Sequence, residues 1–239
     1  MLTGLAGRVL ALLHQLLGCS KRVRTVRILH MPIDLDYLSL FKADVATLTA
    51  DEVYRRYVLP DACKGLTEVD ELALRFKIAN KFNIDVAKVI IVGSAKLGFT
   101  LRHKQKTEKK AERPAFSPFS ENSDIDVAVV SDVLFDYIWK QCLDFWHTSG
   151  YANAKSYWAE GPKFRDYFFR GWMRPDKLPS EGEYSYKHDW FDFFRRELAS
   201  ERAAGDYTIN AGVYRESYFL ETYQKIAINE CCVQVKNTK

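Results

Sequence analysis

The spacing of apolar residues predicts helices that alternate with a few short strands. An amphipathic helix is expected at the N-terminus, where apolar positions recur at helical spacing through Leu2, Leu5, Val9, Leu12, Leu13 and Leu16. Thr49 followed by Glu52, and Thr67 followed by Asp70, have the spacing of helix starts, and the first of these helices must end or bend near Pro60. Later helices are predicted from Ser131 through Trp146, over His188–Ser200 and over Glu216–Asn229.

Short β-branched runs predict the strands. They cover Lys88–Val92, Asp124–Ser131 and Tyr207–Tyr214. The order of elements is typical of a mixed α/β or α+β fold, with a small sheet flanked by helices. We expect residues 1–48 to form an N-terminal helical arm and residues 49–239 to form the main domain.

Composition leaves the partner open. The chain has 239 residues, of which 47% are hydrophobic and 28% charged, so it can bury a substantial core. A formal net charge of +4 permits a nucleic-acid or polyphosphate partner without requiring one.

The cysteines and the N-terminus favour a cytoplasmic protein. The five cysteines show no metal-ligand spacing, which fits reduced thiols. The segment ending at Cys19 has the look of a lipoprotein cleavage site, but Arg8 and His14 interrupt its apolar run, and an amphipathic helix is the better interpretation. No run of about 20 uninterrupted apolar residues predicts a membrane span.

The residues that suggest chemistry lie between positions 90 and 126. Gly93-Ser94 ends one buried strand, where a glycine lets the backbone approach a phosphate and Ser94 adds a hydroxyl. Asp124 and Asp126 lie two residues apart in the next strand, so their carboxylates share one face. Paired hard oxygen ligands suit Mg²⁺ or Mn²⁺, so this segment predicts a phosphate seat beside a metal site.

In this order and in these strand contexts, the Gly-Ser turn and the Asp-x-Asp pair resemble the nucleotidyltransferase superfamily of the DNA polymerase β type, including its stand-alone prokaryotic members. The resemblance covers roughly residues 88–214. It implies metal-dependent transfer of a nucleoside monophosphate from a nucleoside triphosphate such as ATP, with Asp124 and Asp126 as metal ligands. A third carboxylate is expected on a later strand.

The third carboxylate is where the chain departs from the family. Asn210 stands at the centre of the strand in which that acid is sought, and Asp206 at the start of the strand is the substitute candidate, ahead of Asp189 and Asp192. A neutral amide cannot act as the base that deprotonates an acceptor.

A long basic connection over residues 100–123 is the second departure. A loop of this length without periodicity is usually functional or disordered. Lys96, Arg102 and Lys104 lie closest in sequence to the Gly-Ser turn and are the predicted phosphate contacts, while ordinary surface lysines are the alternative.

These observations lead to two hypotheses. The first is a Mg²⁺-dependent nucleotidyltransferase whose acceptor, RNA or protein among others, the sequence does not identify. The second is a weak or inactive nucleotide- or RNA-binding module of the same fold, in a defence or toxin–antitoxin setting.

Overall fold

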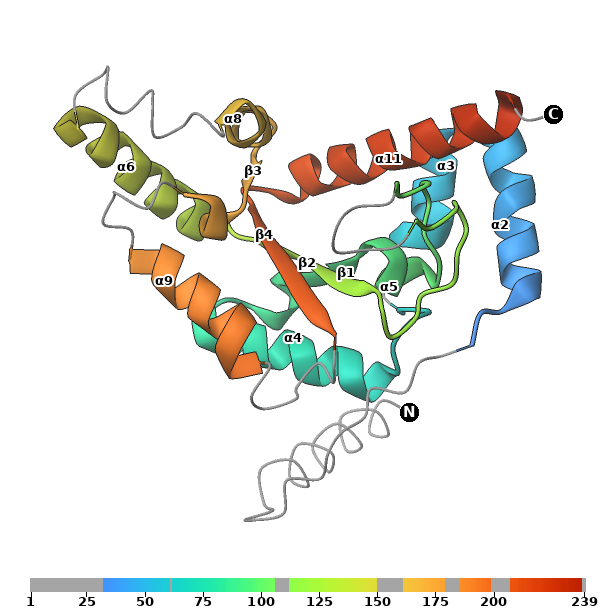
Figure 1. Ribbon diagram of the computed structural model, residues 1–239, viewed down its shortest axis with the longest axis horizontal. Coiled ribbons are helices and arrows are strands. Elements are labelled where there is room, and N and C mark those ends of the chain that lie inside the picture. The colour runs from blue at the N-terminus through green and yellow to red at the C-terminus, as the bar shows by residue number, and fades with distance from the viewer. Residues whose placement is uncertain are drawn as a thin grey trace, which may run out of the picture.

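The described strands form one mixed sheet with helices on both faces (Figure 1). The computed structural model describes residues 32–60, 62–105, 112–149, 161–178, 185–198 and 207–237. The strands are β1 (Val89–Val92), β2 (Asp124–Val130), β3 (Trp172–Met173) and β4 (Thr208–Tyr214), in the spatial order β1-β2-β4-β3. The predicted mixed α/β fold is therefore confirmed.

Strand pairing brings the motif-bearing segments together. β2 runs antiparallel to β1 and parallel to β4, and β3 runs antiparallel to β4. The register places Val92 beside Asp126 on one side of β2, and Asn210 beside Asp126 on the other. Asp126 therefore lies between the end of β1 and the middle of β4.

The helices begin largely where the sequence places their caps. The described helices are α2 (Leu35–Thr47), α3 (Ala50–Val53), α4 (Glu68–Phe82), α5 (Gly93–Leu97), α6 (Asp132–Ser149), α8 (Gly161–Phe169), α9 (Ser185–Asp192) and α11 (Ser217–Asn237). α3 continues into the π-helical turn η1 (Tyr54–Val58) and α9 into η4 (Phe193–Glu197), while η2 (Val86–Lys88) and η3 (Pro175–Lys177) are 3₁₀ turns. Thr49 and Glu52 form the predicted capping box, and the Thr67 side chain accepts from the Asp70 N–H.

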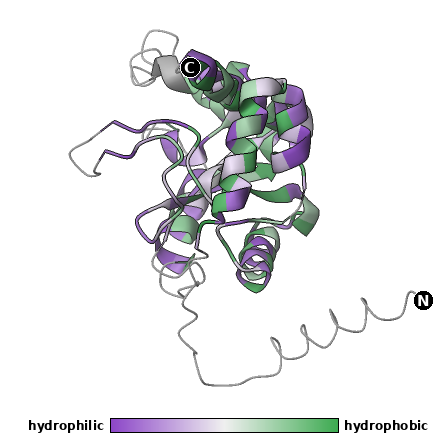
Figure 2. Cartoon of the chain, turned by 90° about the vertical axis from the view of Figure 1, so that its right-hand side faces the viewer, coloured by the Kyte–Doolittle hydropathy of each residue, from purple (hydrophilic) through white to green (hydrophobic). Residues whose placement is uncertain are grey.

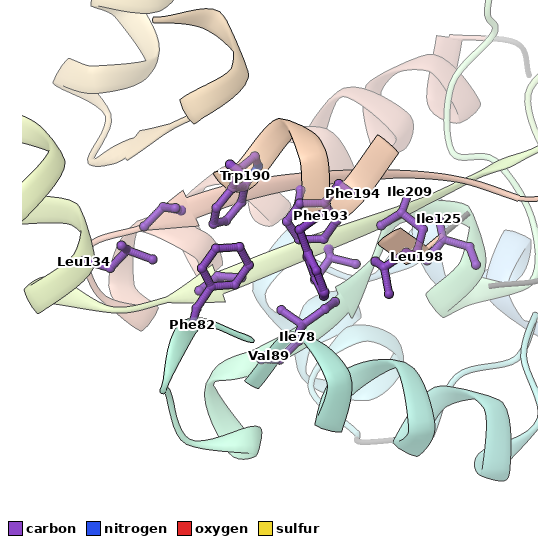
Figure 3. Close-up of a cluster of buried hydrophobic side chains, with 14 of the residues drawn as sticks. Ile78, Phe82, Val89, Ile125, Leu134, Trp190, Phe193, Phe194, Leu198 and Ile209 are labelled. Carbon is purple, nitrogen blue, oxygen red and sulfur yellow. The ribbon is translucent and has the colours of Figure 1, made fainter. Parts of the chain in front are cut away.

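One face of the sheet is fully covered by α4, α6, α9 and η4. Ile125 of β2 and Ile209 of β4 point into this cluster and are 0% and 3% exposed. Phe82 packs against Trp190 with ring centroids 4.8 Å apart, and Phe193 joins them from η4 (Figure 3). Each large apolar side chain buried here contributes about 1.5–3 kcal/mol to the stability of the fold. This face therefore carries the main hydrophobic core.

The opposite face carries a smaller cluster and is covered by α8 and α11. Ala128 and Val130 of β2 lie on it together with Trp172, Tyr214 and Leu220. Because side chains alternate along a strand, Asp124 and Asp126 belong to this same face. The carboxylates therefore lie on the less crowded side of the sheet.

The N-terminal part of the described chain packs onto α11. Phe41 of α2 contacts Phe99 with ring centroids 4.9 Å apart, in a third cluster that also holds Tyr57 and Cys231. The described part of the predicted arm over residues 1–48 contains the helix α2, whose N-cap is Asp34. The predicted N-terminal helix and Cys19 lie outside the described residues, and the boundary after residue 48 stays a prediction.

The basic connection begins and ends as a hairpin rather than as an irregular loop. Thr100 N–H donates to Ser117 O at 2.9 Å, and Lys104 and Arg113 exchange backbone hydrogen bonds of 2.8 and 2.9 Å. Figure 2 shows its described parts, mostly hydrophilic, projecting from the body. Its first arm is tied to α11 by an ion pair of 2.6 Å between Arg102 and Glu230.

Two elements between α6 and η3 were not predicted from the sequence. α8 and the short β3 lie between α6 and η3, and β3 pairs with the end of β4. None of the described helices has an apolar stretch long enough for a bilayer.

Candidate functional site

The Gly-Ser turn lies directly against one of the two motif carboxylates. Gly93 has φ +68, and a Cβ added there would lie 2.9 Å from Oδ2 of Asp126. The left-handed backbone and the close approach both require glycine. Ser94 is 8% exposed and lines the same cavity as Gly93 and Asp126. The structure therefore brings together Gly93, Ser94 and Asp126.

A cavity of about 610 Å³ opens on this face of the sheet. Its floor includes Asp126, Asn210 and Gly212 from the two parallel strands, and its volume falls within the usual range of small-molecule sites. Four cationic side chains line it, Arg102, Lys104, Arg174 and Lys177, against the single carboxylate of Asp126. This charge balance favours an anionic ligand.

The four cations differ in how far they are already paired. Arg102 is bound to Glu230, and Arg174 makes two contacts of 3.1 and 2.8 Å with Asp176. Within the part of the chain that the structure describes, Lys104 and Lys177 show no ion pair. These two lysines are the cations best placed to neutralise a bound anion.

The position of Lys96 differs from the predicted contact with phosphate. Its side chain is 4% exposed, its ammonium donates to the carbonyl of Pro60, and it is absent from the cavity wall. The backbone beside it is held in the same way, because Lys64 N–H donates to Lys96 O and Gly65 N–H to Ala95 O, both at 2.9 Å. Lys96 fastens α5 to the segment after η1, and does not reach a ligand in the cavity.

Asp126 lies in an environment that disfavours its charge. Burial is the largest cause that raises the pKa of this carboxyl, and the neighbouring charge of Asp124 raises it further. Lys104, a hydrogen bond from Asn210, and Arg174 act in the opposite direction. A bound cation would add to these charge-stabilising effects.

Asn210 occupies the position at which the third acid was sought. It is the register partner of Asp126, and its amide oxygen accepts from Arg195 at 3.4 Å. Asp206 lies outside the described residues. The lesser candidates Asp189 and Asp192 are absent from the cavity wall.

Mg²⁺ fits this site if a bound phosphate supplies some of its ligands. The described residues contain no cluster of three or more histidine, cysteine or acidic side chains able to hold a metal. Mg²⁺ commonly binds through one or two carboxylates and completes its shell with waters and substrate phosphates. Asp126 lines the cavity, whereas Asp124 lies outside its wall, on the same strand face and close enough to raise the pKa of Asp126. The two carboxylates match that smaller donor set, so the fit is to a metal that arrives with a phosphorylated ligand.

An aromatic wall completes the cavity and was missed by the sequence analysis as a ligand surface. It consists of Phe164, Tyr167, Trp172, Tyr214 and Tyr223, contributed by α8, β3, β4 and α11. At their spacings in the sequence, Phe164, Tyr167 and Trp172 could stack on bases but are more often core residues, and a core role was favoured. The one further signal is that Asn210 and Tyr214 lie four residues apart, on one face of a strand.

Comparison of the chain with protein-family models finds no matching family, and comparisons with curated proteins and with solved structures find no significant match.

Proposed function

We propose that this protein binds a nucleoside triphosphate beside Asp124 and Asp126 and transfers its nucleoside monophosphate to an acceptor. The observation that carries the proposal is the contact of Gly93 with Asp126, which joins the turn to the carboxylate inside a cation-lined cavity. A turn or an acidic pair alone is common on protein surfaces, whereas the two in contact at a cavity floor form a site.

Each residue has a role in this proposal. The left-handed turn at Gly93-Ser94 receives the phosphates, with the Ser94 hydroxyl as a hydrogen-bond donor. Lys104 from the hairpin and Lys177 from η3 both line the cavity and neutralise the phosphate oxygens. Asp124 and Asp126 would hold Mg²⁺, which supplies charge neutralisation and polarises the reacting phosphate. Asn210 orients Asp126 through its hydrogen bond.

A second function, nucleotide binding without transfer, is favoured by Asn210. Two-metal transfer normally relies on a further carboxylate, and an amide can neither carry the negative charge nor accept the acceptor's proton. If no other base serves, the same cavity binds the nucleotide and presents it without reaction.

The experiment measures binding and transfer on the same preparation. Nucleotides labelled at the α-phosphate are incubated with Mg²⁺ or Mn²⁺ and with total tRNA or the protein itself as acceptor, while affinity is measured by calorimetry. The comparison is with Asp124→Asn/Asp126→Asn, and Asp144→Asn, an exposed acid on α6, is the matched charge control.

Three outcomes separate the hypotheses. Label transfer by the wild type and by Asp144→Asn, abolished in the double variant, supports the transferase. Metal-dependent binding without transfer to either acceptor supports the binding module. If the wild type and the double variant bind nucleotides equally weakly, both functions are excluded.

A further inference from the structure

The aromatic wall of the cavity has no assigned role in phosphate binding. Trp172 stacks with Tyr167 at a centroid distance of 4.1 Å and with Tyr214 at 5.5 Å, and Tyr223 meets Trp172 edge-on at 5.2 Å. Tyr167 and Tyr223 are only partly buried and line the cavity. Their rings are therefore accessible to a ligand, whereas Trp172 and Tyr214 support them from behind.

The strand register fixes the distance from this wall to the carboxylates. Asn210, Gly212 and Tyr214 share one face of β4, with Asn210 beside Asp126 and Tyr214 beside Trp172. At a rise of about 3.4 Å per residue, Asn210 and Tyr214 are separated by roughly 14 Å. The cavity thus has a polar end at Asp126 and Asn210 and an aromatic end at Tyr214. The distance between the two ends is comparable to the length of a nucleotide.

Gly212 lets the aromatic end reach toward the polar one. A Cβ at this position would lie 3.4 Å from Cε3 of Trp172 and 3.3 Å from the carbonyl oxygen of Met173. The absence of a side chain allows the indole ring to lie over the strand between Asn210 and Tyr214. The aromatic surface therefore begins about two residues, or roughly 7 Å, from Asn210.

Hydrogen-bonding capacity is also left at this end. Trp172 is 7% exposed, and its indole N–H has no hydrogen-bond partner among the described residues. A buried donor without an acceptor is costly, and an acceptor on a ligand would remove that cost.

We propose that Tyr167 and Tyr223, backed by Trp172 and Tyr214, bind the nucleobase of the nucleotide whose phosphates lie at Gly93-Ser94 and Asp126. This assignment rests on the proposed nucleotide function and orients the ligand, with its base under α11 and α8 and its phosphates toward the hairpin. Stacking on an aromatic ring tolerates every base, so purines and pyrimidines both bind, and the larger purines bind more tightly.

The test compares ligands with and without a base. Affinities of Mg·ATP and Mg·tripolyphosphate are measured by calorimetry for the wild type and for Tyr223→Leu, Tyr223→Phe and Tyr167→Leu. Tyr218→Leu is the matched control, because Tyr218 lies on the same helix, is 68% exposed and does not line the cavity. Tyr223→Phe keeps the aromatic ring and removes the hydroxyl, so it separates the effect of losing the ring from the effect of changing the side chain.

The expected result is selective loss of the base contribution. Wild-type protein binds Mg·ATP more tightly than Mg·tripolyphosphate, and Tyr223→Leu or Tyr167→Leu weakens ATP binding by roughly 5- to 100-fold without changing tripolyphosphate binding. Tyr223→Phe and Tyr218→Leu bind ATP within about twofold of the wild type, a difference too small to reflect loss of a stacked base.

Other outcomes overturn the assignment in distinguishable ways. Equal wild-type affinities for ATP and tripolyphosphate exclude a base seat and leave the phosphate seat in place. If the leucine variants lose affinity for ATP and tripolyphosphate to the same extent, the aromatic wall affects phosphate binding and does not bind the base. If the wild type binds neither ligand, the nucleotide function fails and the base seat fails with it.

Discussion

Asn210 lies opposite Asp126 in the parallel pair of β2 and β4 and donates a hydrogen bond from its amide to the carboxylate. Its amide oxygen accepts from Arg195, so the side chain uses both ends of its amide. An aspartate there would accept from Arg195 equally well but would repel Asp126. The amide therefore lowers the pKa of the Asp126 carboxyl, against the larger effect of burial, which raises it.

An acid placed at position 210 should make stability depend on divalent metal. We expect Asn210→Asp to lower the melting temperature in EDTA by about 1–4 °C, because directly opposed like charges cost about 0.2–1 kcal/mol. Mg²⁺ should recover this loss, since the added carboxylate becomes a ligand, and any label transfer should increase. The measurement is thermal unfolding with EDTA and with Mg²⁺.

Asn210→Ala is the control for this prediction, because it removes the same hydrogen bond without adding charge. Its melting temperature should respond to Mg²⁺ no more than that of the wild type. An identical Mg²⁺ response of the two variants would count against a metal at Asp126.

The contact between Gly93 and Asp126 predicts a defect in binding that exceeds the defect in stability. Gly93→Ala must adopt a left-handed backbone, at about 1–2 kcal/mol, and its Cβ displaces the Asp126 carboxylate. We expect nucleotide affinity to fall at least about tenfold, because a displacement costing 1.4 kcal/mol of binding already has that effect. Calorimetry with Mg·ATP and urea unfolding measure the two effects separately.

Gly98→Ala provides a matched comparison, since Gly98 has φ +82 and a Cβ there meets Lys64 at 3.2 Å, away from Asp126. It should lose similar stability but retain nucleotide affinity. Equal affinities of the two variants would show that the turn has no part in binding.

Local sequence patterns predicted the helices and strands that carry this site, whereas the position of Asn210 beside Asp126 depends on long-range strand pairing. The capping box at Thr49, the strand before Gly93 and the Asp-x-Asp strand follow from spacing and propensity within a few residues. The position of Asn210 beside Asp126 depends on the register of strands about 80 residues apart in sequence, which no local pattern encodes.

Two further features depend on packing between segments that are distant in sequence. A lysine near a Gly-Ser turn suggests phosphate, but the direction of the Lys96 side chain is set by the packing of α5 against Pro60. Tyr167 and Trp172 resemble core residues in sequence, and only the pairing of β3 with the end of β4 places them at the cavity. Sequence spacing thus located the carboxylates and not the cavity around them.

Lys96 and Lys104 should respond to substitution in opposite ways. Lys96→Met leaves the Pro60 carbonyl without its donor and should lower the free energy of unfolding by about 1–3 kcal/mol, with nucleotide affinity retained in the folded fraction. Lys104→Met should leave stability within about 0.5 kcal/mol of the wild type, because the residue is exposed, but weaken nucleotide binding and flatten its dependence on salt.

Urea unfolding and calorimetry at two or more salt concentrations check this pair. Lys177→Met, from η3 at the same cavity, should behave as Lys104→Met does. A stable Lys96→Met protein that loses nucleotide affinity would restore the phosphate role that the sequence suggested.

Buried thiols predict that the fold loses stability at alkaline pH. Burial raises the pKa of Cys142 to about 12, and burial followed by Cys232 raises that of Cys231 to about 11, against about 8.5 for an unfolded thiol. Above about pH 8.5 the unfolded chain therefore releases protons that the folded chain retains, and unfolding becomes more favourable as pH rises. Each thiol contributes at most about 1.4 kcal/mol per pH unit in this window.

Urea unfolding at pH 7.5, 9 and 10 measures this dependence, and stability should be highest at the lowest of these values. A Cys142→Val/Cys231→Val variant should show a shallower decline, because its unfolded state has fewer thiols to ionise. The decline does not vanish, since burial also raises the pKa of Tyr214, and a hydrogen bond to Asp44 adds to burial at Tyr57. The same slope in wild type and variant would show that these thiols ionise as readily in the folded protein as in the unfolded chain.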